Sequence, residues 1–198
     1  MRRRPCIALA IAIGVLASVS AAPAQSTRTA APAGPVQYRI DPERSQITFK
    51  AYSLLQNAEG RFHKFDGQIT ADPRNLATAR LTVTIDVASI DTKIQKRDNH
   101  LKSPDFFDVG RYPTATFEST GVTPADGRAT VKGRLTMRGV TREIEVPVDV
   151  EIADDALTAR GELAVNRLHY EISYQSIINP VKDVVDIAFT FVARRAAP

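Results

Sequence analysis

The sequence has little of what small proteins use for covalent or metal-based stability. It contains one cysteine, Cys6, three histidines and no tryptophan in 198 residues. Because Cys6 lies in an N-terminal segment that we expect to be removed, the mature chain would have no thiol for a disulfide, a nucleophile or a metal site. The histidines, His63, His100 and His169, lie in separate segments without the short ligand spacing of a zinc site. We therefore predict no metal and no cofactor.

An excess of charge of one sign is also missing once the N-terminus is set aside. The whole chain has 26 Lys and Arg against 22 Asp and Glu, a formal net charge of +4. Removing residues 1–24 takes away three arginines and no acid, so 26 − 3 = 23 basic residues remain and the net charge falls to +1. No basic field is left to attract nucleic acid, and we predict no nucleic-acid partner. Phosphate loops, nucleophile elbows and dinucleotide fingerprints are absent too.

The N-terminus has the layout of a secretory signal peptide. A basic start, an uncharged apolar run and a small-residue cleavage site follow one another at residues 2–4, 6–19 and 22–24. The apolar run is too short to span a membrane, so we expect cleavage after Ala24 and a periplasmic protein that is not membrane-spanning. Residues 25–35, rich in Ala, Thr and Pro, are predicted to be a disordered tether. Residues 36–195 are predicted to form one domain.

What the chain does have is a two-residue alternation of apolar and polar side chains. The alternation is clearest over residues 128–152, and a period of two is typical of a sheet with one buried and one wet face. Eight such segments are predicted as strands, at residues 47–51, 60–71, 81–87, 115–117, 128–138, 143–152, 157–165 and 185–193.

Eight antiparallel strands at this spacing favour an all-β, closed up-and-down barrel, because closure removes exposed sheet edges. A two-sheet sandwich is the alternative. An outer-membrane barrel is disfavoured, because the chain has no tryptophan and no aromatic girdle at its strand ends. Residues 92–107 break the alternation, and we predict a short helical insert there, between strands 3 and 4. Ser103 followed by Pro104 predicts the cap of a further turn.

The predicted inner face carries both small and aromatic side chains. Its small members are Ala51, Gly67, Ala71, Ala115, Ala129, Gly133, Ala159 and Gly161. So many small residues predict unfilled apolar volume that could hold a ligand. The alternative is an ordinary packed core in which glycine and alanine allow the sheet to bend.

Several phrases then occur together in a specific order. They are G-x-F-x-x-F-x-G at residues 60–67, then residues 86–92, 97–101, 103–109, 112–113 and 133–141. In this order they resemble the YceI-like family of secreted polyisoprenoid-binding proteins over about residues 37–193. The resemblance implies a lipocalin-like barrel that holds an isoprenoid in its lumen, and it implies no established catalytic residues.

The predicted ligand-binding set combines this resemblance with the inward-facing positions. The resemblance carries over to Phe62, Phe65, Phe106, Phe107 and Phe117, and to the polar residues Arg97, Asp98 and His100. The inward positions Phe49, Ile85 and Leu135 and the insert residue Leu101 complete the set. The polar members either receive a head group at the mouth or form ion pairs that hold the insert.

The chain departs from the family pattern at Glu171, which stands where the family has a glycine. A glycine there could adopt a positive φ that a glutamate resists. The loop that follows, residues 173–183, is long, and it forms one side of the predicted rim.

The sequence thus predicts a non-enzymatic periplasmic carrier of a long apolar lipid, of the quinone or polyprenyl type. One alternative is a stress-related interaction protein with a filled barrel. Another is an enzyme at the barrel mouth that uses His100 with Asp98 or Asp105 as an acid–base pair. The sequence leaves the oligomeric state open, a dimer included.

Overall fold

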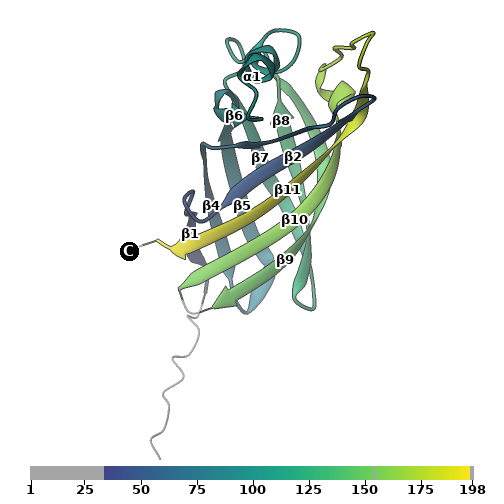
Figure 1. Cartoon of the computed structure of the whole chain (residues 1–198). Coiled ribbons are helices and arrows are strands. Elements are labelled where there is room, and N and C mark those ends of the chain that lie inside the picture. The colour runs from purple at the N-terminus through teal and green to yellow at the C-terminus, as the bar shows by residue number, and fades with distance from the viewer. Residues whose placement is uncertain (1–33, 154, 197–198) are drawn as a thin grey trace, which may run out of the picture. The chain divides into compact units, whose positions relative to one another are not determined.

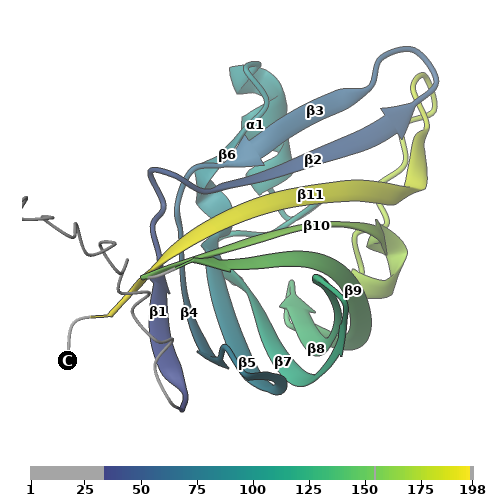
Figure 2. The same ribbon diagram turned by 90° about the horizontal axis from the view of Figure 1, so that it is seen from below.

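The alternating segments pair into one antiparallel sheet that closes on itself. The computed structural model describes residues 34–153 and 155–196, and its strands wrap into a barrel (Figures 1 and 2). The barrel order is β1-β4-β5-β7-β8-β9-β10-β11, closed by the pairing of β1 with β11. The bounds are β1 Val36–Ile40, β4 Phe65–Asp72, β5 Asn75–Asp86, β7 Thr114–Ala125, β8 Arg128–Met137, β9 Val140–Ala153, β10 Ala156–Asn166 and β11 Val181–Arg195. The predicted eight-stranded antiparallel barrel is confirmed.

The predicted signal peptide, residues 1–24, lies outside the described residues, as does the predicted tether up to residue 33. The cleavage point and the tether therefore stay predictions.

Three further strands extend the sheet beyond the barrel. β2 (Gln46–Ser53), β3 (Ala58–Phe62) and β6 (Ile90–Asp91) follow β11 in that order, on one side of the barrel (Figure 2). β11 pairs with β1 near its C-terminal end and with β2 along the rest of its length. The predicted first strand, residues 47–51, is therefore β2, and the strand that closes the barrel is β1.

The predicted second strand, residues 60–71, is interrupted at His63 and Lys64. The backbone N–H of His63 donates to the carbonyl of Ser89 at 3.3 Å, and that of Lys64 donates to Ser89 Oγ at 3.0 Å. These bonds tie His63 and Lys64 to the short η1 helix, Val87–Ser89, so that residues 60–71 do not form one continuous strand. The interruption separates β3 of the extension from β4 of the barrel.

The barrel has two unlike ends. At the hairpin end, tight connections join β4 to β5, β7 to β8 and β9 to β10. At the helix end lie α1 (Gln95–Lys102), η2 (Arg167–Tyr170) and the loops at residues 54–57 and 171–180 (Figure 1). α1 falls between β6 and β7, as the predicted insert requires. Ser103 caps the C-terminus of α1 instead of starting a new helix, although a turn does follow it.

The two ends of the barrel interior are packed differently. Toward the hairpin end Tyr38, Ala71 and Ala193 are at most 1% exposed, whereas Leu76, Val122 and Val150 pack against this core and stay half-buried. Toward the helix end, inner apolar residues pack against this core and stay only half-buried, among them Ile85, Phe117, Leu135, Ile144, Leu163 and Ile187. The most deeply buried residues therefore lie around β1 and the neighbouring ends of β4 and β11, and half-buried apolar residues border this core toward both ends.

Aromatic rings fill much of the space that the inner glycines leave. A Cβ added at Gly133 would lie 2.3 Å from the Phe117 ring, and one at Gly161 would lie 2.6 Å from the Phe189 ring. Glycine is required at both positions because the rings approach the backbone so closely. The expectation that small residues leave a wide lumen is therefore wrong in part, since neighbouring phenylalanines occupy that volume.

Candidate functional site

The part of the lumen nearer the helix end, which we call the upper lumen, contains an apolar cavity of about 100 Å³. Every side chain that lines it is aliphatic or phenylalanine: Ile47, Leu81, Val83, Ile85, Phe117, Val131, Leu135, Ile144, Val146, Val148, Leu163, Ile187, Phe189 and Phe191. The predicted ligand residues Ile85, Phe117 and Leu135 lie here. With no polar group on its wall, this cavity can select only apolar chains.

A second cavity, of about 60 Å³, lies toward the hairpin end. It shares Leu81, Val131, Val148, Phe189 and Phe191 with the upper cavity, so the two are neighbours in the lumen. The rings of Phe189 and Phe191 stack with their centroids 4.8 Å apart. Movement of these two rings would join the two cavities.

A chain of phenylalanine rings connects the extension strands to the insert. The Phe62 ring lies 5.7 Å from the Phe49 ring and 6.2 Å from the Phe107 ring, in tilted and edge-on arrangements that aromatic pairs favour. Phe65, also predicted as a ligand residue, is instead a core residue that packs against Phe191 at 6.0 Å.

A groove of about 520 Å³ lies at the helix end, beside the insert. Its walls come from α1, from β2 and β3, and from the loop at residues 171–180. The predicted residues Arg97, His100, Leu101 and Phe106 line it together with Ala51, Ser53, Gln56, Ala58, Ile94, Lys96, Tyr174, Ser176, Asn179 and Val181. This groove combines apolar surface with hydrogen-bonding groups, whereas the lumen has apolar surface alone.

Three rings form the aromatic part of the groove. Phe106 and Tyr174 lie 5.0 Å and 4.8 Å from the His100 ring, both edge-on to it. The His100 ring also contacts Asp105 through Nε2, at 3.0 Å from Oδ2. Both partners of this pair are exposed, at 41% and 58% of their side chains. An exposed pair of this kind fixes a ring in position and contributes little to stability.

Arg97 and Asp98 hold the insert to the preceding loop through Thr92. Asp98 Oδ1 accepts hydrogen bonds from the backbone N–H and the hydroxyl of Thr92, at 2.9 and 2.5 Å. Arg97 donates from Nε to the Thr92 hydroxyl at 2.8 Å and from Nη2 to the Thr92 carbonyl at 2.9 Å. Thr92 is buried, so these bonds brace α1 against β6. Arg97 also lines the groove.

A buried arginine organises the opposite wall of the groove. Arg167 is 4% exposed, and its guanidinium donates to the carbonyls of Ile172, Tyr174, Val181 and Lys182. It also pairs with Asp183 at 3.2 Å. These bonds fix both ends of the loop that carries Tyr174. The sequence predicted neither Arg167 nor Tyr174 as site residues, because the loop has no periodicity from which to infer their positions.

Glu171 adopts the left-handed conformation expected of the glycine it replaces. Its φ is 59° and its ψ is 21°, at the C-cap of η2. The Arg138 guanidinium donates to the Glu171 carbonyl and, at 2.8 Å, to the carbonyl of Pro104. The turn between β8 and β9 is therefore linked both to the insert and to the loop after η2.

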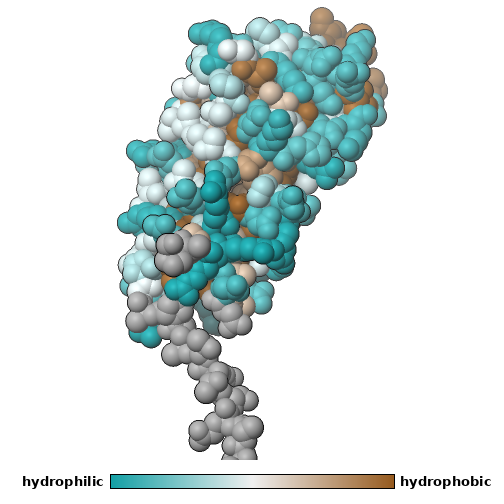
Figure 3. Space-filling view, turned by 90° about the vertical axis from the view of Figure 1, so that its left-hand side faces the viewer, coloured by the Kyte–Doolittle hydropathy of each residue, from teal (hydrophilic) through white to brown (hydrophobic). Residues whose placement is uncertain are grey.

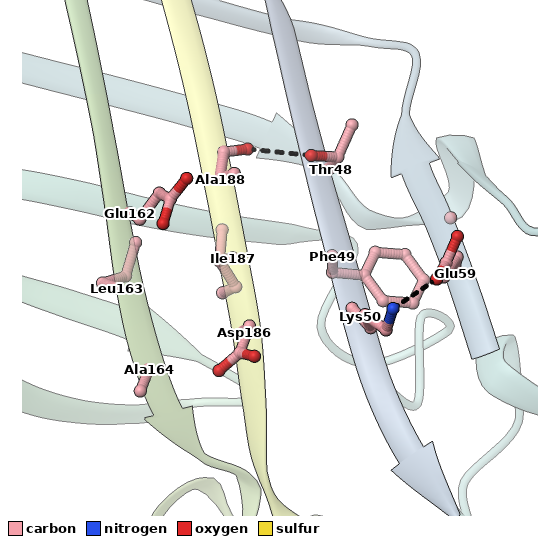
Figure 4. A pocket seen from close by; sticks show the side chains of 11 residues that line it. Thr48, Phe49, Lys50, Glu59, Glu162, Leu163, Ala164, Asp186, Ile187 and Ala188 are labelled. Carbon is pink, nitrogen blue, oxygen red and sulfur yellow. Dashed lines mark hydrogen bonds and ion pairs between the residues drawn. The ribbon is translucent and has the colours of Figure 1, made fainter. Parts of the chain in front are cut away.

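The outer face of β10, β11, β2 and β3 has a hollow of about 740 Å³ (Figure 4). It is a shallow region of sheet that opens to solvent. Lys50 pairs with Glu59 at 2.8 Å across it, and the Thr48 hydroxyl donates to the Ala188 carbonyl at 3.3 Å. Because it is shallow and open to solvent, it is a weaker candidate than the lumen and groove.

Within residues 34–153 and 155–196, no three His, Cys, Asp or Glu side chains come together as a metal site. In the same ranges, no helix combines the length and the apolar character needed to cross a bilayer.

Comparison with known proteins identifies the family. The model of the YceI-like domain matches residues 38–193. The chain belongs to the YceI-like family. A UPF0312 protein of Pseudomonas paraeruginosa is 41% identical over 124 residues, which are 60% of this chain and 63% of that protein. The match thus spans less than two thirds of that relative.

Solved structures share the YceI-like barrel. The crystal structure of Burkholderia cenocepacia BcnA has a TM-score of 0.73 and 31% identity, over 77% of this chain and 98% of that one. A polyisoprenoid binding domain from Saccharophagus degradans, implicated in plant cell wall breakdown, has a TM-score of 0.68 over 81% of this chain and 99% of that one. At 17% identity it shows the fold alone.

Proposed function

We propose that this YceI-like protein binds a long apolar lipid, with its tail in the lumen and its head in the groove at the helix end. The observation that carries the proposal is an upper lumen cavity lined only by aliphatic and phenylalanine side chains, in a barrel whose helix end carries a groove with polar groups. Burying a tail in such a wall is favourable by about 0.8 kcal/mol per CH₂ group.

The size of the lumen determines how a tail would enter. Ligand pockets commonly measure about 300–1,000 Å³, so the groove is large enough as it stands and the lumen cavities are not. Since Phe189 and Phe191 line both lumen cavities, rotation of these rings would make one channel along the barrel axis. We infer that the tail widens the lumen as it enters.

An isoprenoid of the quinone or polyprenyl type is the proposed ligand class. Such a lipid has a long, branched, wholly apolar tail and a compact polar head, which matches a dry lumen beside a polar rim. Arg97 and His100 would then contact the head group, in addition to their bonds with Thr92 and Asp105. The polyisoprenoid-binding domain with the same fold is consistent with this class.

A periplasmic location is part of the proposal. It rests on the N-terminal sequence, whose basic start, apolar run and small-residue cleavage site are those of an exported protein. In that compartment a carrier would shield the lipid tail from water between membranes. We infer binding and not catalysis, because the His100–Asp105 pair is exposed and braces the insert.

A filled barrel that acts through a protein partner is the second candidate. The small volume of the two lumen cavities favours it.

Native mass spectrometry of protein purified from the periplasm without detergent separates the two candidates. The carrier proposal expects a stoichiometric lipid that leaves on denaturation and is absent from a mock purification of cells without the protein. An apo mass, together with no uptake of added ubiquinone or polyprenyl phosphate, would favour the filled barrel.

A further inference from the structure

Large exposed apolar side chains are confined to one end of the barrel. Among the described residues they are Leu54, Leu55, Ile94, Leu168, Ile177, Ile178 and Val184, all in loops or strand ends of the helix end. Figure 3 shows hydrophobic surface at the upper end of the molecule, where Figure 1 places these loops. Single exposed apolar residues are ordinary, whereas a cluster marks a contact surface.

Four of these residues form what we call the apolar tip: Leu54, Leu55, Ile177 and Ile178. Their exposures are 72%, 70%, 101% and 80%. The first two lie between β2 and β3, and the other two lie in the loop before β11. They are far more exposed than the remaining three, which lie between 40% and 43%.

Hydrogen bonds between the two loops hold the tip in this arrangement. The backbone N–H of Leu54 donates to the carbonyl of Pro180 at 3.2 Å, and that of Leu55 donates to Asn179 Oδ1 at 2.7 Å. Asn179 Nδ2 donates in turn to Ser53 Oγ at 3.0 Å. The backbone groups are thus satisfied within the protein while the aliphatic side chains remain outside.

We propose that the apolar tip inserts into the interface of a lipid bilayer and brings the groove to the membrane surface. The role that we give this contact rests on the proposed function. Gln56, Ser176 and Asn179 line the groove and belong to the same two loops, and Ser53, which also lines it, ends β2 beside them. A lipid leaving the bilayer beside the tip would meet the groove first.

Size and composition favour a bilayer over a protein partner. A stable protein interface buries about 800 Å² on each side and is anchored by aromatic and arginine residues. The tip offers four aliphatic side chains on two protruding loops, with no aromatic residue among them. Aliphatic side chains on a protrusion gain most from entering hydrocarbon.

The charged groups beside the tip are mixed in sign, three acidic and three basic. Glu59 pairs with Lys50 at 2.8 Å, Asp186 accepts from the Tyr52 hydroxyl at 2.7 Å, and Asp183 pairs with Arg167. Lys182 lies over the Tyr52 ring, 5.5 Å from its centroid, and makes no ion pair within the described ranges. Asp186 keeps its negative charge when it accepts from a neutral hydroxyl and offsets Lys182, so the contact rests on the apolar side chains and not on net charge.

Because the chain has no tryptophan, a single introduced tryptophan reports insertion directly. We expect Ile177→Trp to show a blue-shifted emission with vesicles of phosphatidylethanolamine and phosphatidylglycerol at 3:1, and quenching by brominated acyl chains. Leu168→Trp, an exposed position of the same end outside the tip, should show neither. Equal responses at the two positions, or no response at Ile177→Trp, would overturn the proposal.

Flotation with the same vesicles tests the tip without a fluorophore. Replacing all four tip residues by serine should lower the partition coefficient at least tenfold, while Leu168→Ser with Val184→Ser should leave it within twofold. Equal thermal midpoints will show that both variants fold. Unchanged partitioning of the tip variant would overturn the proposal, as would a wild-type dimer that the tip variant converts to monomer.

Uptake of ubiquinone separates this proposal from the proposed function. The tip variant should acquire ubiquinone from vesicles at least tenfold more slowly than the wild type and from detergent micelles at the same rate. If the wild type floats with vesicles but takes up ubiquinone from neither source, docking stands and the lipid-carrier function fails. If both proteins acquire ubiquinone from vesicles equally fast, the tip has no role in transfer.

Discussion

The hairpin end and the helix end of this barrel are made from the same alternating strands, yet they are packed for different purposes. At the hairpin end the connections are tight, and the most deeply buried inner residues, Tyr38, Ala71 and Ala193, lie there beside a cavity of only about 60 Å³. At the helix end the inner residues are half-buried, and the loops expose apolar side chains. One end of a small barrel can therefore carry the stability that leaves the other end free to open.

The sharpest test of this difference is the same substitution at both ends. Ile40 lies in the packed core and lines neither lumen cavity, whereas Ile144 lies on the wall of the upper cavity. Ile40→Ala should lower the free energy of unfolding by about 3 kcal/mol, because it leaves a cavity in a packed region. Ile144→Ala should cost about 1 kcal/mol, since its site already borders open volume. Equal losses in urea unfolding would show that the two ends are packed alike.

Arg167 is the exception at the helix end, because it is buried and essential to the loop at residues 171–180. Arg167→Met removes the donors to four backbone carbonyls and to Asp183, and should cost about 2–3 kcal/mol. Amide exchange in that loop should become faster, while β4 and β5 stay protected. Arg134→Met, which removes an exposed pair with Glu118, is the control and should change stability by less than about 0.5 kcal/mol. Unchanged loop exchange in Arg167→Met would contradict this role.

Glycine substitutions at two glutamates test whether the left-handed backbone at Glu171 is strained. The expected changes in stability are smaller and have opposite signs. Glu171→Gly should stabilise the protein by about 0.5 kcal/mol, because relief of the left-handed conformation exceeds the entropy that glycine adds to the unfolded chain. Glu162→Gly, in the middle of β10, should destabilise it by about 0.5–1 kcal/mol. Thermal unfolding of both variants gives the two signs, and a loss of stability in Glu171→Gly would contradict the argument.

The smallest expected effect is a dependence on pH at β6. Hydrogen bonds from His63 and Lys93 hold the pKa of the Asp91 carboxyl well below its usual range. A depressed pKa in the folded state means that the contribution is present above the ordinary value of about 3.9 and is lost as the pH falls through the folded value. Asp91→Asn should therefore lower the thermal midpoint at pH 6 and converge on the wild type in acid.

The period of two was enough to predict the barrel and the face on which each strand residue lies. Ile85 and Leu135 were placed on the inner face for this reason, and both line the upper lumen cavity, as does Phe117, which the family resemblance supplied. β1 was missed although its five residues alternate between buried and exposed positions, and the break at His63 depends on bonds to the distant Ser89.

Features set by side-chain conformation or by loops could not be read from the pattern. The phenylalanine rings that cover Gly133 and Gly161 reduce the lumen by an amount that depends on their rotamers. Tyr174, Arg167 and the apolar tip depend on how a loop without periodicity folds back on the barrel. Whether Arg97, Asp98 and His100 touch a ligand stays a prediction, although their bonds with Thr92 and Asp105 show how they hold the insert.

The central claim is that the helix-end lumen holds the lipid tail, and a matched pair of tryptophan substitutions tests it most directly. Ile144→Trp fills the lumen, whereas Glu143→Trp places the same ring one position earlier in β9, on the outer face of the barrel. Titration with ubiquinone in detergent should show affinity reduced at least tenfold in Ile144→Trp and unchanged in Glu143→Trp. Wild-type affinity in a folded Ile144→Trp variant would contradict the claim.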